Sequence, residues 1–258
     1  MKKLKILLTN DDGIQAAGLR TLWDGLKDVA DLSIVAPMRE QSGKGISVSF
    51  DSPIRVEEDD SYPNTPAWKV NGTPADCVKL ALGGLLDFPP DLIVSGVNHG
   101  SNAGRGFLHS GTAGAVIQGT IQGIPGIAFS YVCHKSKEFP HVKPYLFPIV
   151  DYIGKHPLPH GSFLNVNFPN KTIQGVKMAR HGMAFWLDSF RKERHPEGHL
   201  EFHLEDLISN YEEHPESDIA LLKAGFITAV PIHVNQMTDH THFENFKTHF
   251  ESQQNLFE

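Results

Sequence analysis

The stretch "LLTNDDGIQAAGL", residues 7–19, decides the fold, because it leads from a strand into a helix through a polar turn. The run before the turn, residues 5–9, is apolar, and large apolar side chains then recur at helical spacing over about residues 15–29. A strand and a helix joined in this way form the first unit of an alternating α/β fold. The turn holds Asp11 and Asp12, two adjacent carboxylates that repel each other and therefore need a compensating partner.

The same alternation continues through the first half of the chain. Apolar runs rich in Val and Ile occupy residues 32–36, 91–97 and 124–130, and helical stretches separate them. One helix is expected to begin at Thr73, where a hydroxyl N-cap precedes a proline, and another follows the sequence "SGT" at residues 110–112. Continuous apolar strands separated by helices predict a mainly parallel sheet that is covered on both faces.

Other segments depart from this pattern. Three short β-like segments, residues 45–50, 53–58 and 67–70, are expected to form hairpins beside the main sheet. From about Phe139 onward the α/β alternation weakens, although residues 163–168 and 226–234 still resemble strands. Residues 181–217 are rich in His, Glu and Pro without a regular pattern, and we expect a protruding hairpin or arm that serves oligomerisation. Residues 1–135 are therefore expected to form the core with the active site, and residues 136–258 to complete the core and add the arm.

Composition excludes several classes of protein. The net charge of −7 argues against a surface that coats a nucleic-acid polymer, and no window approaches the roughly 20 apolar residues of a membrane span. The basic start "MKKLKILL" is soon interrupted by Asn10, so we interpret it as a strand and not as a secretory signal. The two cysteines are far apart, and Cys77 lies among apolar residues, which predicts a buried free thiol and a cytoplasmic location.

The 15 histidines suggest metal binding, but most of them are scattered. In "HLEFHLED", residues 199–206, His and Glu alternate with Leu and Phe. A period of two is typical of a half-buried strand with a polar outer face. We prefer that interpretation to a metal site.

Oxygen-bearing side chains follow three of the expected strands. Asp11 and Asp12 end the first, Ser42 follows the second in a glycine-flanked turn, and Asn98 ends the run 91–97. Ligands of parallel α/β sheets bind at the carboxyl edge, and oxygen ligands suit Mg²⁺ or Mn²⁺ better than Zn²⁺. The alternative is that one aspartate simply caps the following helix, although capping needs only one of the two.

A candidate phosphate site is supplied by Ser110, Gly111 and Thr112, which immediately precede a helix rich in small residues. Backbone N–H groups and hydroxyls at a helix N-terminus bind anions, and an ordinary helix cap is again the alternative. Neither the dinucleotide fingerprint nor the Gly-Lys-Ser/Thr of a triphosphatase occurs. A metal beside a phosphate cradle without these signatures indicates hydrolysis of a phosphomonoester.

Taken together, the segments "TNDDGIQAAGL", "VAPMREQSG", "VNGTPADCVKLAL", "PDLIVSGVNHGSN" and "SGTAGAV" resemble the SurE family of metal-dependent nucleotidases, in the family's order. The resemblance implies a Rossmann-like three-layer sandwich, a domain-swapped dimer or tetramer built through the C-terminal half, and 5'- and 3'-nucleotidase activity on nucleoside monophosphates. It also implies one divalent cation per subunit. By this resemblance the metal ligands are Asp11, Asp12, Ser42 and Asn98, the first two being catalytic, and the phosphate-binding residues are Asn98, Ser110, Gly111 and Thr112.

Three departures from the family pattern leave the expected metal site intact, but they leave open the substrate preference and the assembly that the resemblance implies. His109 stands where the family usually has Tyr, "AVPIHVN" replaces a Thr-Pro-Leu run, and Ser217 replaces a Gly before Asp218. Two other functions stay open at this point: a broader phosphatase or exopolyphosphatase, and a nucleotide sensor that binds metal and phosphate without turnover. Whether Asp11 also acts as base or nucleophile is open as well.

Overall fold

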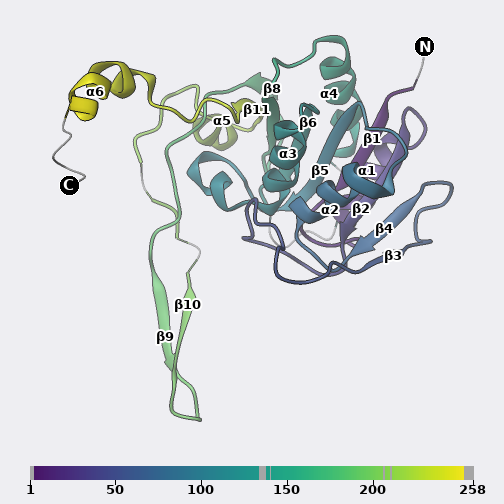
Figure 1. Cartoon of the computed structure of the whole chain (residues 1–258), viewed down its shortest axis with the longest axis horizontal. Coiled ribbons are helices and arrows are strands. Elements are labelled where there is room, and N and C mark those ends of the chain that lie inside the picture. Colours follow the sequence, from purple (N-terminus) through teal and green to yellow (C-terminus); the bar gives the residue numbers. More distant parts are fainter. Residues whose placement is uncertain (1–2, 134–137, 140, 206, 210, 253–258) are drawn as a thin grey trace.

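The computed structural model describes residues 3–133, 138–139, 141–205, 207–209 and 211–252 (Figure 1). Its centre is a nine-stranded sheet in the order β3-β4-β2-β1-β5-β6-β7-β11-β8. The strands are β1 (Lys5–Thr9), β2 (Asp31–Pro37), β3 (Val56–Glu58), β4 (Ala67–Val70), β5 (Leu92–His99), β6 (Gly126–Tyr131), β7 (Ser162–Phe168), β8 (Gly175–Met178) and β11 (Phe226–His233). The strands from β4 to β7 are parallel, whereas the pairs β3–β4 and β7–β11 are antiparallel.

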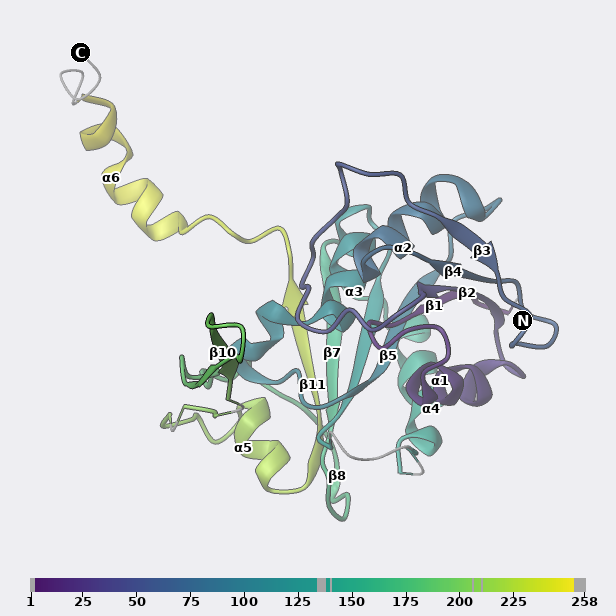
Figure 2. The same ribbon diagram turned by 90° about the horizontal axis from the view of Figure 1, so that it is seen from below.

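Helices cover both faces of this sheet (Figure 2). The helices α1 (Ala17–Leu26) and α4 (Lys143–Lys155) pack on one face, and α2 (Pro74–Leu80) and α3 (Gly111–Ile121) pack on the other. The strand β1 explains why: Ile6 and Leu8 belong to the first core and Leu7 to the second, because alternate side chains of a strand point to opposite faces. The prediction of an α/β sandwich with a mainly parallel sheet is confirmed.

The strand order determines where on the sheet a ligand site is expected. From β1 the chain proceeds to β2 on one side, and β5 pairs with β1 on the other side. The direction of winding therefore reverses between β1 and β5, and the carboxyl ends of both strands open into one crevice. This is the position at which doubly wound α/β folds bind ligands.

The segments expected as hairpins beside the sheet differ from prediction. β3 and β4 do form an antiparallel pair, but β4 also pairs with β2, so the hairpin extends the main sheet. Residues 45–50 form no strand. Their backbone bonds to the start of α2 instead, where Thr73 Oγ1 donates to the Ser47 carbonyl and the Ser49 N–H donates to Asp76.

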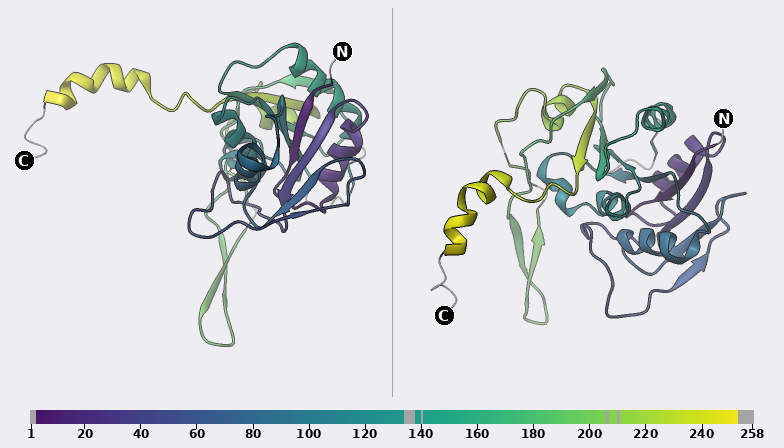
Figure 3. Two further views of the ribbon diagram at one scale, coloured as in Figure 1. Left: turned by 45° about the vertical axis from the view of Figure 1, so that its right-hand side comes forward. Right: turned by 45° about the horizontal axis from the view of Figure 1, so that its top comes forward.

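The expected arm is present between β8 and α5 (Asp218–Lys223). Its strands β9 (Phe190–Arg194) and β10 (Leu200–Leu204) pair only with each other and project from the body, as does the helix α6 (His240–Ser252) (Figure 3). The expected half-burial of the strand within residues 199–206 is wrong for the single chain. Phe202 and Leu204 are 58% and 60% exposed, because nothing in the described part of the chain packs on the apolar face of the hairpin.

Three helices of the second half, α4, α5 and α6, were not predicted. A proline inside α4, Pro148, conceals its helical pattern, since proline normally ends a helix. Short connecting turns complete the chain, including the π-helical turn η1 (Ala81–Leu85) and the 3-10 helix η2 (Gly104–His109). Cys77 is free and fully buried as predicted, and Cys133 is free. None of the helices in the described ranges is long and apolar enough to cross a membrane.

Candidate active site

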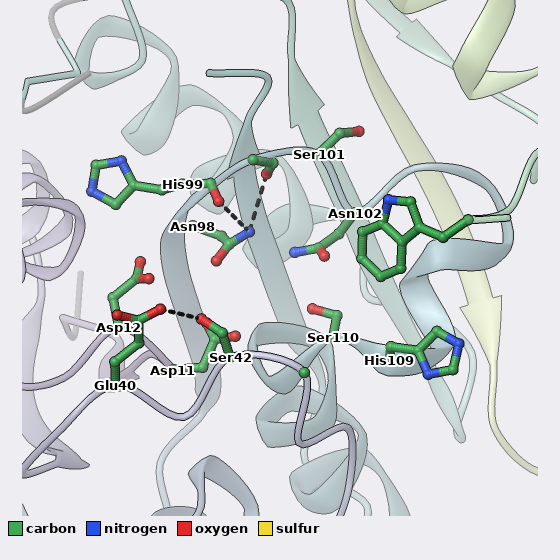
Figure 4. Close-up of a pocket in the computed structure, with 13 residues that line it drawn as sticks. Asp11, Asp12, Glu40, Ser42, Asn98, His99, Ser101, Asn102, His109 and Ser110 are labelled. Carbon is green, nitrogen blue, oxygen red and sulfur yellow. Dashed lines mark hydrogen bonds between the residues drawn. The ribbon is translucent and has the colours of Figure 1, made fainter. Parts of the chain in front are cut away.

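A cavity of about 610 Å³ opens at the carboxyl ends of β1 and β5 (Figure 4). Three loops and the N-terminus of α3 supply most of its wall. Its lining residues are Asp11, Asp12, Glu40, Ser42, Gly43, Asn98, His99, Gly100, Ser101, Asn102, His109, Ser110 and Trp186. The structure thus brings together Asp11, Asp12, Ser42, Asn98 and Ser110, whereas the predicted residues Gly111 and Thr112 lie behind the wall.

The turn after β1 directs its carboxylates into the cavity. Asn10 closes the turn, because its amide donates to the Gly13 carbonyl at 2.9 Å and its side-chain oxygen accepts the Gly13 N–H at 3.2 Å. Gly13 has a φ of +101°, which side-chain-bearing residues rarely adopt. The N-cap of α1 is Ala16, and its side chain makes no capping bond. Neither aspartate caps α1, so the capping alternative is wrong.

Asp11 is held against the start of α3. The hydroxyl of Thr112 donates to Asp11 Oδ1 at 2.5 Å, and the side chain of Asp11 is only 3% exposed. Gly111 permits this approach, since a Cβ at that position would lie 2.8 Å from Asp11 Cβ. The N-terminus of α3, where partial positive charge accumulates, therefore faces a carboxylate directly.

Burial raises the pKa of both carboxyl groups. Loss of solvent raises the pKa of Asp11 to about 7, with a contribution from the negative charge of Asp12, although the hydrogen bond from Thr112 opposes the shift. Loss of solvent likewise raises the pKa of Asp12 to about 6; Glu40 adds to this shift and a backbone bond from His99 opposes it. In the protein alone, the site therefore disfavours the charged forms of both carboxyl groups, and a cation would reverse this preference.

Asn98 reaches the cavity through an irregularity of β5. The pairing of β5 with β6 shifts between Ser95 and Asn98, and a β-bulge of this kind re-aims the side chains that follow it. Gly96 is needed there, since its φ is +125° and a Cβ would lie 2.3 Å from the Phe129 carbonyl oxygen. The Asn98 amide nitrogen donates to the carbonyls of His99 and Gly100 (Figure 4), which leaves its Oδ1 as the atom available to a ligand.

The loop after β2 contributes two oxygen-bearing side chains. Ser42 Oγ donates to Glu40 Oε1 at 2.8 Å, and both residues line the cavity. The Gln41 N–H donates to the Asp11 carbonyl at 2.7 Å, which fixes the loop against the end of β1. Glu40 was not predicted as a site residue, although it lies two residues before Ser42 in the strand-end segment that carried that prediction.

Ser110 and Thr112 have different roles at the start of α3. Ser110 is the N-cap, with its Oγ accepting the Ala113 N–H at 3.1 Å, and it also lines the cavity. Thr112 is fully buried and uses its hydroxyl on Asp11. The capping role of Ser110 and a place on the cavity wall therefore coexist.

A buried amide network supports the wall formed by residues 98–102. Asn102 donates through its side chain to Ser130 Oγ at 2.8 Å and through its backbone N–H to Asn167 Oδ1 at 2.8 Å. Asn165 donates to the Asn102 carbonyl at 2.8 Å. Asn102 lines the cavity and was not predicted as a site residue.

One lining residue, Trp186, comes from the second half of the chain. It belongs to the arm base, which we define as residues 182–186. Its indole lies 6.0 Å from the His109 imidazole between ring centroids, with an interplanar angle of 27°. No sequence signal indicated that this segment reaches the cavity.

Asp218 fastens the arm base to η2. Its carboxylate is fully buried and accepts the backbone N–H groups of Gly104 at 3.1 Å, Gly182 at 2.9 Å and Ile219 at 2.8 Å. The absence of a side chain at Gly182 permits this close approach, since an added Cβ would lie 2.6 Å from Asp218 Oδ1. A single side chain therefore joins α5, the arm base and the segment that leads to Ser110.

The donor set of the cavity fits a hard divalent cation. Asp12 Oδ2 is buried and has no hydrogen-bond partner among the described residues, and Asn98, whose amide nitrogen is engaged by backbone carbonyls, lines the same cavity. Carboxylate, amide and hydroxyl oxygens are the ligands that Mg²⁺ and Mn²⁺ prefer. The residues that would hold the cation are Asp11, Asp12, Ser42 and Asn98.

Two other groups of potential ligands lie on the arm, namely His195 with Glu197 and His199, and Glu193 with Glu201 and His203. Their side chains are exposed or half-buried on one face of a two-stranded hairpin, and Glu193 already pairs with Arg191. A solvated polar face accounts for them, in agreement with the predicted strand, which the structure places at Leu200–Leu204 as β10; residue 206 of the predicted segment lies outside the described residues.

Fold and cavity together define an α/β protein of the Rossmann-like class, with an oxygen-rich cavity at the point where strand winding reverses. The family model described as Survival protein SurE matches residues 6–188. The chain belongs to the SurE family, as its motifs predicted.

Relatives of known name and structure support this assignment over nearly the whole chain. A protein named 5'-nucleotidase SurE from Protochlamydia amoebophila is 44% identical over 253 residues, covering 96% of this chain and 97% of the relative. The protein of the same name from Trichormus variabilis is 39% identical, covering 90% of this chain and 93% of the relative. The crystal structure of Sure protein from Aquifex aeolicus is similar with a TM-score of 0.81 at 30% identity, covering 95% of this chain and 98% of that one.

Proposed function

We propose that this chain is a divalent-metal-dependent phosphomonoesterase that hydrolyses nucleoside 5'-monophosphates, and also 3'-monophosphates, to nucleoside and phosphate. The expectation of an enzyme of the nucleotidase class is confirmed by the relatives, since both curated proteins described above are named 5'-nucleotidase. The requirement for one Mg²⁺ or Mn²⁺ ion per subunit and the action on 3'-monophosphates are our own proposals.

The observation that carries the metal requirement is the charge of the cavity. Among the described residues that line it, three are carboxylates and none is Lys or Arg. A phosphate dianion approaching Asp11, Asp12 and Glu40 would be repelled. A bound divalent cation would offset the carboxylates, polarise a phosphoryl oxygen and lower the pKa of an attacking water.

The protein groups then position the substrate. Ser110 presents its hydroxyl at the cavity wall, and the first turn of α3 directs its positive end to the same place. Asn98 is fixed by two hydrogen bonds, and the buried amides around Asn102 hold the neighbouring wall. Groups held in this way need no reorganisation when charge develops on the phosphoryl oxygens.

The assembly we propose is a homodimer or homotetramer built through the second half of the chain. One face of the hairpin of β9 and β10 exposes Phe190, Leu200, Phe202 and Leu204, each by more than 40%, beside the paired residues Lys192 and Arg194. The helix α6 exposes Phe243, Phe246 and Phe250 in the same way. Apolar faces of this kind mark protein interfaces, and a second copy of this chain is the proposed partner. Sedimentation equilibrium tests this: a monomer at micromolar concentration would contradict it.

The test of function is phosphate release from nucleoside 5'- and 3'-monophosphates, sugar phosphates and polyphosphate, with EDTA and after Mg²⁺ or Mn²⁺ is restored. We expect release from nucleoside monophosphates, loss in EDTA and recovery with metal. Asp11→Asn should abolish turnover while unfolding stays cooperative, because it removes one anionic ligand without changing side-chain volume.

Each contrary result has its own meaning. Equal release in EDTA would exclude the metal requirement, and preferential release from sugar phosphates or polyphosphate would identify a broader phosphatase. Binding of nucleotide without release from any substrate would identify a sensor. Full activity of Asp11→Asn would refute the assignment of Asp11 as a ligand.

A further inference from the structure

The cavity has an aromatic end that phosphate chemistry does not use. His109 is exposed at the end of η2, and Trp186 is half-buried in the arm base, yet both line the same cavity as Asp11 and Asp12. Their rings lie nearly parallel, 27° apart, with centroids separated by 6.0 Å. Two flat π surfaces therefore stand at the rim of a site whose other end is made of oxygen ligands.

Burial of apolar surface does not explain this placement. A tryptophan that served only packing would be covered by the core, whereas this indole stays accessible to the cavity. It packs over Gly106, where an added Cβ would lie 3.8 Å from the ring. Gly106 leaves room for the indole on the side of η2, and the indole still lines the cavity.

The aromatic end is also fixed relative to the phosphate end. His109 immediately precedes Ser110, the N-cap of α3 that lines the cavity. The Arg105 N–H donates to the Ala184 carbonyl at 2.8 Å, which joins η2 to the arm base two residues before Trp186. A Cβ at Gly104 would lie 2.7 Å from the same carbonyl oxygen, so the two backbones are in close contact.

We propose that Trp186 and His109 form the subsite for the nucleobase, which stacks on their rings while its phosphate lies at Asp11, Asp12 and Ser110. The inference rests on the proposed function and adds the recognition of the base. Every nucleobase has a π-face, so stacking selects an aromatic base without reading which base it is. The site then accepts several bases and discriminates against phosphomonoesters that lack one.

The test compares adenosine 5'-monophosphate with ribose 5-phosphate, which keeps the phosphate and sugar but has no base. Loss of a stacking side chain typically weakens binding by roughly 5- to 150-fold. We expect Trp186→Ala to raise KM for adenosine 5'-monophosphate within this range, with a smaller rise for His109→Ala, and kinetics on ribose 5-phosphate to stay unchanged. Trp186→Phe keeps an aromatic face and should restore most of the affinity.

Phe185→Ala is the matched control, because Phe185 is the neighbouring aromatic residue of the arm base, is 40% exposed and does not line the cavity. It should leave both substrates unaffected. An equal loss on both substrates in Trp186→Ala, or none on either, would overturn the base subsite. Should Trp186→Ala not fold, the same comparison with His109→Ala and Trp186→Phe decides the matter.

Calorimetric titration with adenosine, which has no phosphate, separates this inference from the proposed function. Binding of adenosine by the wild type, weakened in Trp186→Ala, would support the subsite even if no phosphate were released from any substrate. Adenosine binding no tighter than that of ribose would overturn it, even in an active phosphatase.

Discussion

The hydroxyl of Thr112 donates a hydrogen bond of 2.5 Å to Asp11, across the gap between the end of β1 and the first turn of α3. It is a buried contact between a residue predicted to bind metal and one predicted to bind phosphate. Because the hydroxyl opposes the rise in the pKa of Asp11, it favours the carboxylate form that a cation requires. Thr112 therefore acts on the candidate metal site through Asp11.

Thr112→Val should weaken metal binding, because valine keeps the shape of threonine and leaves Asp11 Oδ1 without its donor. Hydrogen bonds to charged groups contribute about 1.5–3 kcal/mol, so the metal concentration for half-maximal phosphate release should rise roughly 10- to 150-fold. Thr112→Ser keeps the hydroxyl and is the control. A valine variant that needs no more metal than wild type would show that the contact does not tune the site.

The metal-free protein should lose stability as pH rises. Folding raises the pKa of Asp11 from 3.8 to about 7 and that of Asp12 from 3.8 to about 6. A raised acid pKa means that the folded state binds the proton more tightly, so this stabilisation is complete below the unfolded pKa and is lost as pH rises through the folded values. In EDTA, the contribution of these two carboxyl groups to the Tm should therefore decrease as the pH rises from about 4 to about 7.

Two comparisons isolate that contribution. Asp11→Asn removes one of the two titrating groups, so the difference in Tm between wild type and variant in EDTA should change with pH in the same window. Mg²⁺ or Mn²⁺ should raise the Tm of the wild type more at pH 8 than at pH 5, because cations compete with protons for the same oxygens. A difference in Tm that is independent of pH would contradict the assigned pKa of Asp11.

Gly111→Ala should damage the site more than the fold. The new methyl group would lie 2.8 Å from Asp11 Cβ and 2.9 Å from its Oδ2, so the carboxylate must move. Misplacement of a reactive group by about 1 Å costs on the order of 100-fold in rate, and phosphate-release kinetics with a thermal melt measure both effects. Gly84→Ala is the control and should change neither, because an added Cβ there would have no atom within 4 Å apart from its chain neighbours and the backbone of its own helical turn. Activity of Gly111→Ala equal to wild type would show that Asp11 has room to shift.

Local patterns in the sequence were sufficient for the parts of the site at strand ends. Asp11, Asp12 and Asn98 follow apolar runs that became β1 and β5, and parallel pairing brings the carboxyl ends of such strands together. Ser110 was found from its position before a helix, and it proved to be both the cap and a lining residue. These predictions needed only periodicity and strand direction.

The remainder depended on contacts that no local pattern records. Trp186 reaches the cavity because Asp218 and the Ala184 carbonyl bind the backbone of η2, and these partners are distant in sequence. Residues 45–50 have a strand-like composition, but their backbone groups bond to the start of α2. The apolar alternation of β10 was recognised, yet alternation alone does not say whether the covering surface belongs to the same chain.

Asp218→Asn should act as a change in positioning, because Asp218 holds the arm base and touches neither the cavity nor a substrate atom. Asparagine keeps one acceptor oxygen but replaces the other with an NH₂ group. That group would face the backbone N–H of Gly104 or of Gly182, which now donates to the Asp218 carboxylate. Leaving such a buried donor unsatisfied costs about 1–3 kcal/mol of folding free energy. The Tm should fall and KM for adenosine 5'-monophosphate should rise, while kcat for ribose 5-phosphate is retained, since Trp186 loses its support and Asp11 does not.

Asp188→Asn is the control for Asp218→Asn, because Asp188 is an exposed carboxylate just beyond the arm base, and it should change none of these quantities. A fall in kcat on both substrates with KM unchanged would instead place the effect of Asp218 at the phosphate end, through η2 and Ser110.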